Sequence, residues 1–115
     1  MKKNIISEKS FQFSLMIVEL CQVLQERREF VISKQLLRSG TSIGANVRES
    51  SAAQSKKDFI SKLSIASKEA RETQYWLELL DNSTRFDLCL DDHLKEIDEI
   101  IRILSSIVIT LSKAK

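Results

Sequence analysis

Apolar residues recur along this chain at the spacing of buried helix faces. From Phe59 to Leu80, apolar or small residues stand alternately four and three positions apart, which is the a/d pattern of a helix packed in a bundle seam. Similar stripes elsewhere predict further helices, so that the expected set covers residues 7–28, 29 or 30 to 51, 55–80, and 91 or 92 to 111. Ser7 and Ser55 are expected to cap two of these helices.

The predicted helices are long and their connections are short. Short connections make sequential helices antiparallel neighbours, and 115 residues are enough for one hydrophobic core. The chain has no proline and only two glycines, so it offers few of the turn signals that a strand-rich fold needs. The sequence therefore predicts an all-α fold: a single domain, residues 1–115, that forms an up-down-up-down antiparallel four-helix bundle.

The second predicted helix contains a run of small residues, 39–45, that includes both Gly40 and Gly44. Each glycine costs a helix about 1 kcal/mol relative to alanine, so close packing on the glycine face must offset the loss. We expect that close approach and a bend of the helix at this segment. Asn46 and Glu49 border the glycine face, and we expect them to make a buried or half-buried polar contact across the bundle rather than to face water.

Two helices carry more apolar surface than a narrow seam needs. In the first helix, Phe11, Leu15 and Val18 are expected to widen the seam. In the last helix the apolar face spans well over ~100°, which is too wide for contact with one neighbour. It is formed by Leu94, Ile97, Ile100, Ile101, Ile103, Leu104, Ile107, Val108 and Leu111. That width predicts a second burial surface on the last helix, and we expect it to be the interface of a homo-oligomer.

The sequence offers no catalytic or metal-binding constellation. His93 is the only histidine, and it is expected to be a solvated residue at a helix start. Glu69 and Glu72 are followed by no histidine at the spacing of a di-iron helical bundle, and the segment from Gly40 to Gly44 lacks the Gly-Lys-Ser/Thr ending of a phosphate loop. We therefore expect a protein that is not an enzyme and that uses no cofactor or metal.

Neither the cysteines nor the hydropathy pattern indicates an extracellular or membrane protein. Cys21 and Cys89 lie in apolar helical patterns and are expected to behave as small buried hydrophobes. The chain lacks a zinc-type cysteine cluster, a signal-peptide pattern and an apolar run of about 18 residues. We expect a cytoplasmic protein with reduced thiols and no membrane contact.

Charge is distributed unevenly along the chain. Residues 1–57 carry ten Lys or Arg against five Asp or Glu, a net charge of +5, whereas residues 58–115 sum to −3. The imbalance favours either a basic face for an anionic partner or a bipolar surface whose halves pair with each other. The candidate nucleic-acid-binding residues are Arg27, Arg28, Lys34, Arg38, Arg48, Lys56, Lys57 and Lys62. Tyr75 and Trp76 are expected to fill core or interface, so any binding would be to phosphates and not to bases.

Several short motifs together resemble the 23S ribosomal RNA intervening-sequence protein family of bacteria. They are Asn46-Val47-x-Glu49, then Lys57-Asp58-Phe59-Ile60-x-x-Leu63-x-Ile65-Ala66, then Glu72 with Leu77, preceded by the small segment around Gly40 and Gly44. The family motif residues carried over are thus Gly40, Gly44, Asn46, Glu49, Asp58, Phe59 and Glu72. The family often has proline in place of Gly44 and glycine in place of Ser50.

The resemblance implies a left-handed antiparallel bundle that assembles as a ring, typically a homopentamer. A related group, the accessory variability determinant proteins of diversity-generating retroelements, forms similar barrels that bind nucleic acid and a reverse transcriptase. The function that we expect is therefore a non-enzymatic, ring-forming bundle that binds nucleic acid, RNA favoured, through phosphate contacts. The alternative is a protein–protein interaction scaffold with no role in nucleic-acid binding.

Overall fold

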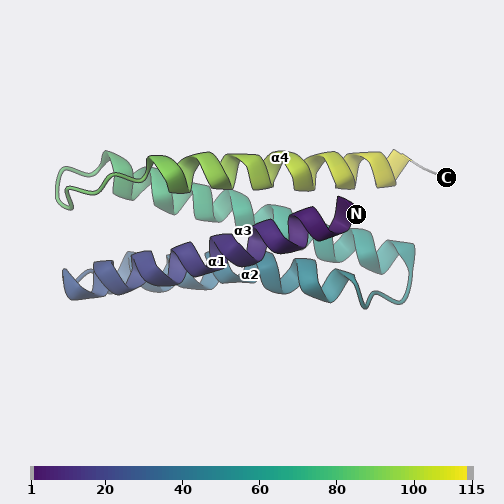
Figure 1. The fold of residues 1–115 in the computed structure, drawn as a ribbon, viewed down its shortest axis with the longest axis horizontal. Helices are drawn as coiled ribbons and strands as arrows, with labels where there is room; N and C mark the ends of the chain where they lie inside the picture. Colours follow the sequence, from purple (N-terminus) through teal and green to yellow (C-terminus); the bar gives the residue numbers. More distant parts are fainter. Residues whose placement is uncertain (1, 114–115) are drawn as a thin grey trace.

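Four helices account for almost the whole chain in the computed structural model, which describes residues 2–113, with side chains from Ile5 onward (Figure 1). They are α1 (Lys2–Glu26), α2 (Val31–Ser50), α3 (Lys56–Asn82) and α4 (Asp91–Lys113). Each helix runs antiparallel to the next, and contacts join α1 to α2, α2 to α3, α3 to α4, and α4 back to α1. The backbones of the diagonal pairs, α1 with α3 and α2 with α4, stay more than 8 Å apart between Cα atoms. The predicted antiparallel four-helix bundle is confirmed.

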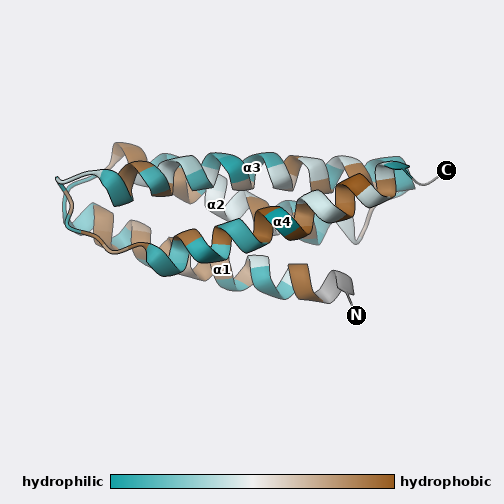
Figure 2. Cartoon of the chain, turned by 90° about the horizontal axis from the view of Figure 1, so that it is seen from above, coloured by the Kyte–Doolittle hydropathy of each residue, from teal (hydrophilic) through white to brown (hydrophobic). Residues whose placement is uncertain are grey.

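The core lies along the axis of a rod that measures 49 × 22 × 20 Å. Apolar positions alternate with hydrophilic ones along every helix (Figure 2), so each helix turns one stripe inward. The largest fully buried side chains are Phe13, Ile17, Leu24, Leu36, Ile43, Leu63, Leu77, Leu80, Leu90, Ile97, Ile100 and Leu104. All four helices contribute, because the a/d spacing identified in the sequence places their residues on the four inner faces, and Leu90 is added from the α3–α4 loop.

The helix starts follow local side-chain chemistry. Ser55 caps α3 as expected: its Oγ accepts a hydrogen bond of 3.0 Å from the backbone N–H of Asp58. The start of α2 is capped by Glu29, whose Oε1 accepts from the N–H groups of Ile32 and Ser33 at 2.6 and 3.0 Å. The expectation for Ser7 is wrong, since α1 already begins at Lys2 and Ser7 lies inside it. Its carbonyl accepts a hydrogen bond from the Ser10 hydroxyl instead.

The small-residue segment of α2 lies in one uninterrupted helix that packs tightly on α1. A Cβ atom added at Gly40 would lie 2.9 Å from Cγ2 of the buried Ile17, and one added at Gly44 would lie 3.3 Å from the carbonyl oxygen of Ser10. Both distances are shorter than ordinary van der Waals contact between a Cβ atom and its neighbours. The expected close packing is therefore confirmed, whereas the bend of α2 stays a prediction.

The apolar face of α4 is covered mainly within the bundle, contrary to expectation. Ile97, Ile100, Ile101 and Leu104 are buried, and Leu94, Ile103, Ile107 and Val108 pack partly against the core. Ile109 is the one large apolar side chain of α4 that is mostly exposed, at 54%. The face is wide because α4 packs against both α1 and α3, so its width alone does not require a second molecule.

The exposed apolar surface lies on other helices instead. Phe11, Leu15 and Val18 were expected to widen the seam of the first helix, but they are 45%, 46% and 48% exposed. Cys89 also departs from its pattern: it lies in the α3–α4 loop and is exposed. Cys21 is buried as expected; its Sγ donates to the Ser33 carbonyl at 3.3 Å, and burial raises the pKa of its thiol to about 11.

We expect Gly44→Leu to lower the free energy of unfolding by about 1–3 kcal/mol, because the new side chain would be forced against the backbone of α1 at Ser10. Ala45→Leu is the matched control, since Ala45 is the next residue and is exposed; it should change stability by less than about 0.5 kcal/mol. Urea unfolding followed by circular dichroism measures both variants. Equal midpoints for the two would show that the α1–α2 contact is not tight at Gly44.

Candidate functional site

A polar network joins α2 to α3 at the middle of the bundle. The Arg38 guanidinium on α2 donates from Nη1 to Glu69 Oε1 at 3.1 Å and from Nη2 to Glu72. Trp76 Nε1 donates to the same Glu72 carboxylate at 3.0 Å. Glu69, Glu72 and Trp76 are neighbours because residues three and four apart share one face of a helix. Glu72, a residue of the family motif, is thus held from two sides.

A buried hydrogen bond lies directly beneath this network. The hydroxyls of Ser39 and Thr73 meet at 2.9 Å, and both side chains are completely buried. The Thr73 hydroxyl also lies 2.8 Å from the Glu69 carbonyl oxygen of its own helix. The two polar groups therefore satisfy each other inside the core, and they fix the register of α2 against α3.

The ionic partners change the proton affinity of the network. The hydrogen bond from Arg38 is the main cause that holds the pKa of the Glu72 carboxyl below its ordinary value, and the hydrogen bond from Trp76 adds to it. Glu72 in turn raises the pKa of Arg38. Both groups stay charged at neutral pH, so the network is an ion pair between two helices and not a proton donor or acceptor site.

The predicted nucleic-acid-binding cations do not form one patch. Arg27, Arg28 and Lys34 lie at the end of the bundle that holds the α1–α2 turn and the α3–α4 loop, where Arg27 Nη1 donates to the Phe86 carbonyl at 3.5 Å (Figure 1). The second group lies at the opposite end, around the α2–α3 turn. It consists of Arg48, Lys56 and Lys57. The antiparallel course of α2 therefore separates residues that the sequence places within one basic half.

The two remaining candidates, Arg38 and Lys62, and also Arg48, bind groups of the same chain. Arg38 belongs to the network above, and Lys62 Nζ pairs with Glu49 Oε1 at 3.1 Å. The Arg48 guanidinium lies 5.6 Å from the centroid of the Phe11 ring, within the range of a cation–π contact. Arg38 and Arg48 remain exposed, so these interactions do not prevent contact with phosphate. Carboxylates already compensate part of the charge of Arg38 and Lys62, and the Phe11 ring already contacts Arg48.

The motif residues Asn46 and Glu49 have different roles. Asn46 is half-buried, but its Nδ2 donates to the Ser42 carbonyl of its own helix at 2.9 Å, so the expected contact across the bundle is wrong for this residue. Glu49 does reach the next helix, through its ion pair with Lys62, yet its side chain is 59% exposed. Neither residue is placed to bind a ligand inside the bundle.

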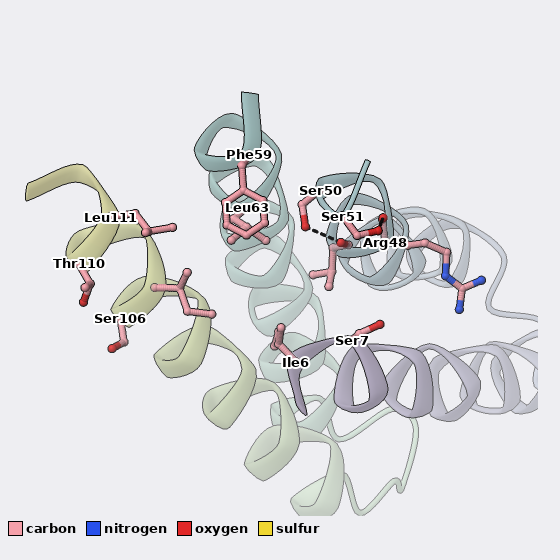
Figure 3. A pocket seen from close by; sticks show the side chains of 12 residues that line it. Ile6, Ser7, Arg48, Ser50, Ser51, Phe59, Leu63, Ser106, Thr110 and Leu111 are labelled. Carbon is pink, nitrogen blue, oxygen red and sulfur yellow. Dashed lines mark hydrogen bonds between the residues drawn. The ribbon is translucent and has the colours of Figure 1, made fainter. Parts of the chain in front are cut away.

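A pocket of about 530 Å³ opens at the end of the bundle near the α2–α3 turn (Figure 3). Its lining is Ile6, Ser7, Val47, Arg48, Ser50, Ser51, Phe59, Leu63, Ser106, Ile107, Thr110 and Leu111. The Arg48 guanidinium points away from it in Figure 3, so the pocket is apolar with hydroxyls at its edge. The pocket could not be predicted from the sequence, because its lining comes together from all four helices.

His93 was expected to be solvated, but it is half-buried. It lies in the first turn of α4, its Nδ1 is buried without a hydrogen-bond partner among the described residues, and burial lowers the pKa of its imidazole. Within residues 2–113, no cluster of three or more His, Cys, Asp or Glu side chains could hold a metal ion. The described helices also include none that is long and apolar enough to cross a membrane.

A family model described as 23S rRNA-intervening sequence protein matches residues 2–106. The chain belongs to this family. It is also similar to the crystal structure of a protein of unknown function from the S23 ribosomal protein family of Bacteroides thetaiotaomicron, with 48% sequence identity and a TM-score of 0.86. That similarity covers 95% of this chain and 99% of the other. No curated protein matches. The resemblance seen in the sequence motifs is confirmed, and with it the shared fold.

We expect Glu72→Gln to reduce stability at pH 7, and the loss to shrink as the pH falls. Because Arg38 and Trp76 lower the pKa of Glu72 in the folded state, its contribution is fully present above the ordinary carboxyl pKa of 4.5 and disappears as the pH falls through the lower folded value. Urea midpoints at pH 7 and at about pH 3 measure the change. Glu78→Gln, at an exposed position of the same helix, is the control and should match the wild type at both pH values. A pH-independent difference for Glu72→Gln would contradict the ionic role.

Proposed function

We propose that this protein is a non-enzymatic, self-associating helical bundle that binds nucleic acid, with RNA favoured, through phosphate contacts. The observation that carries the proposal is the set of cations at the ends of the bundle. Arg28, Lys34 and Lys57 are exposed and form no ion pair with any side chain that the structure describes. Free cations of this kind are what phosphate binding requires, whereas base recognition would require aromatic or hydrogen-bonding groups at a groove.

Self-association would make this modest charge effective. In a ring, each end of the bundle repeats around the axis, so a few cations per chain become a multivalent surface. The resemblance to ring-forming members of the family supports a homo-oligomer, and a pentamer is the form that we favour. The exposed apolar residues Phe11, Leu15 and Val18 support it independently, since monomers rarely leave such a stripe in water.

The absence of catalysis is part of the same proposal. His93, the only histidine of the chain, has a buried Nδ1 with no partner among the described residues, so it has no carboxylate to orient it as a general base. Glu69 and Glu72 are ion-paired with Arg38, and the hydrogen bond from this arginine lowers the pKa of Glu72, which therefore stays ionised at neutral pH. What the described side chains offer is packing, ion pairs and surface charge.

A scaffold for protein–protein interaction, with no nucleic acid, is the second candidate. The observation that favours it is that Arg38 and Lys62, two of the expected phosphate ligands, are paired with carboxylates of the same chain. Under this second candidate, a reverse transcriptase is one class of protein partner, because the related accessory variability determinant proteins bind one. The two readings differ in whether affinity for RNA depends on the free cations.

We expect affinity for a structured RNA to fall steeply with salt, because cations bound to phosphate release counterions. The double variant with Arg28→Gln and Lys34→Gln should weaken binding to unrelated RNA sequences to the same extent. It should also reduce the slope of log affinity against log salt by the amount that corresponds to at most two phosphate contacts. Lys95→Gln with Arg102→Gln removes the same charge from α4 and is the control, which should affect binding less. Fluorescence anisotropy over a salt series measures both.

Two results would decide against this proposal. Wild-type protein that binds neither RNA nor DNA at ~50 mM salt, where electrostatic binding is strong, would favour the scaffold. Equal losses in the two double variants would show that only net charge matters and that the bundle end is not the binding surface. The oligomer is tested separately by sedimentation equilibrium, in which a single species of 13.2 kDa would contradict self-association.

A further inference from the structure

The pocket near the α2–α3 turn exists because α1 is shorter at that end of the bundle than its neighbours. In Figure 1, the end of α4 and the α2–α3 turn extend beyond the start of α1. Lys9 of α1 pairs with Glu99 of α4. From that level α1 continues for about two turns to Lys2, whereas α4 continues for about three turns to Leu111. The last turns of α4 therefore have no α1 residue opposite them.

The pocket has an apolar floor and a polar rim. Ile6, Val47 and Leu63 form the floor, and they are 2%, 4% and 2% exposed. Leu111 is directed from α4 toward Phe59 of α3 (Figure 3), and both are only half-buried, since nothing in the chain fills the space between them. The hydroxyl residues of α4 that line the pocket, Ser106 and Thr110, are exposed. Such a lining suits a ligand with an apolar body and one polar end.

The size of the pocket agrees with a small molecule. Its volume of about 530 Å³ lies within the range of roughly 300–1,000 Å³ that small-molecule sites occupy. An apolar tail in this space would cover the half-buried faces of Phe59, Ile107 and Leu111 and would continue the core of the bundle past the start of α1. Removing that apolar surface from water is the favourable term for binding.

The charges around this end of the bundle are mainly positive. Glu49 is paired with Lys62, and the Asp58 carboxylate accepts from the backbone N–H of Gln54. Farther along the bundle, Lys9 is paired with Glu96 and Glu99. The described charged residues at this end are the cations Arg48, Lys56, Lys57, Lys62 and Lys113 and the acids Glu8, Glu49 and Asp58. The cations outnumber the acids, so the rim favours an anionic group over a cationic one.

Two of these lysines lie one turn beyond residues that line the pocket. Lys56 precedes Phe59 by three positions on α3, and Lys113 follows Thr110 by three positions on α4, so each shares a helix face with its lining neighbour. Both lysines are exposed, and each carries its charge on a flexible stem. The Arg48 guanidinium points away from the pocket and lies over the Phe11 ring instead. An anionic head at the rim would therefore meet lysines of α3 and α4.

We propose that this pocket binds a single-chain amphiphile with an anionic head, of the fatty-acid class. The tail lies on the floor between the ends of the four helices, and the carboxylate lies at the rim beside Lys56, Lys113 and the hydroxyls of α4. The inference goes beyond the proposed function and does not depend on it, because neither RNA nor a second copy of the chain takes part in it.

Calorimetric titration with laurate and with dodecyltrimethylammonium tests the proposal, because the two ligands share a tail and differ in the charge of the head. Below its critical micelle concentration, laurate should bind once per chain and at least about tenfold more tightly than the cationic amphiphile. Raising the salt concentration should narrow this difference, because salt screens the charges. Circular dichroism checks that the helices persist.

Two sets of variants separate the tail from the head. Leu111→Asp places a charge in the pocket and should lower the affinity for laurate at least about tenfold. Ile109→Asp makes the same kind of change at an exposed position of the same helix that does not line the pocket, and it should bind laurate as the wild type does. The double variant with Lys56→Gln and Lys113→Gln should lose the preference for laurate. Lys95→Gln, toward the opposite end of α4, should keep it.

Each other outcome overturns the proposal. Wild-type protein that does not bind laurate, or that binds several molecules per chain with loss of helical signal, has no such site. Equal affinity for the two amphiphiles excludes recognition of an anionic head. Equal affinity of Leu111→Asp and Ile109→Asp for laurate places the tail elsewhere. If only Leu111→Asp changes the oligomeric size of the ligand-free protein, a second copy of the chain occupies the pocket. Leu111→Ser with Ile109→Ser as its control replaces the pair if Leu111→Asp has lost its helical signal.

Discussion

The close approach of α1 and α2 at Gly40 and Gly44 determines the geometry of the rest of the molecule. With no side chain at these positions, Ile17 and the backbone at Ser10 pack directly on α2. The helix loses about 1 kcal/mol of propensity at each glycine, and tertiary contact must offset it. Because α2 also packs on α3, its position brings Ser39 to Thr73 in the core and Arg38 to Glu72 above it. A shift of α2 away from α1 would disturb all of these contacts together.

The polar network between α2 and α3 adds specificity more than net stability. Its charged members are partly exposed, with Arg38 at 48% and Glu72 at 35%, so water screens the attraction and the free-energy gain is small. The buried pair of hydroxyls beneath it has a different effect, because slipping α3 along α2 would break the hydrogen bond between them and leave each only a carbonyl of its own helix. Small residues thus set the distance between helices, and buried polar groups set their register.

The sequence predicted the fold well because a/d spacing is a local property. Helix number, order, direction and most core residues followed from it, and so did the Ser55 cap. It failed where the answer depends on the neighbours of a helix. Phe11 looked like core and is exposed, whereas the wide face of α4 looked like an interface and is covered by α1 and α3. The predicted basic half likewise became two separate ends, because spacing along a chain does not give distance across an antiparallel bundle.

On this protein, exposed apolar stripes indicate an interface more clearly than exposed charges do. A cation on a helix can serve an ion pair, a ring or a phosphate, and Arg38, Arg48 and Lys34 show that one helix holds both engaged and free examples. An exposed apolar stripe at seam spacing is harder to explain on a monomer, since each such residue would otherwise remain in water. Exposed apolar residues of this kind lie on two diagonal helices, α1 and α3. In a homo-oligomer of the kind proposed, phosphate binding at the bundle ends would be a property of the assembly, because assembly is what places copies of the same free cations side by side.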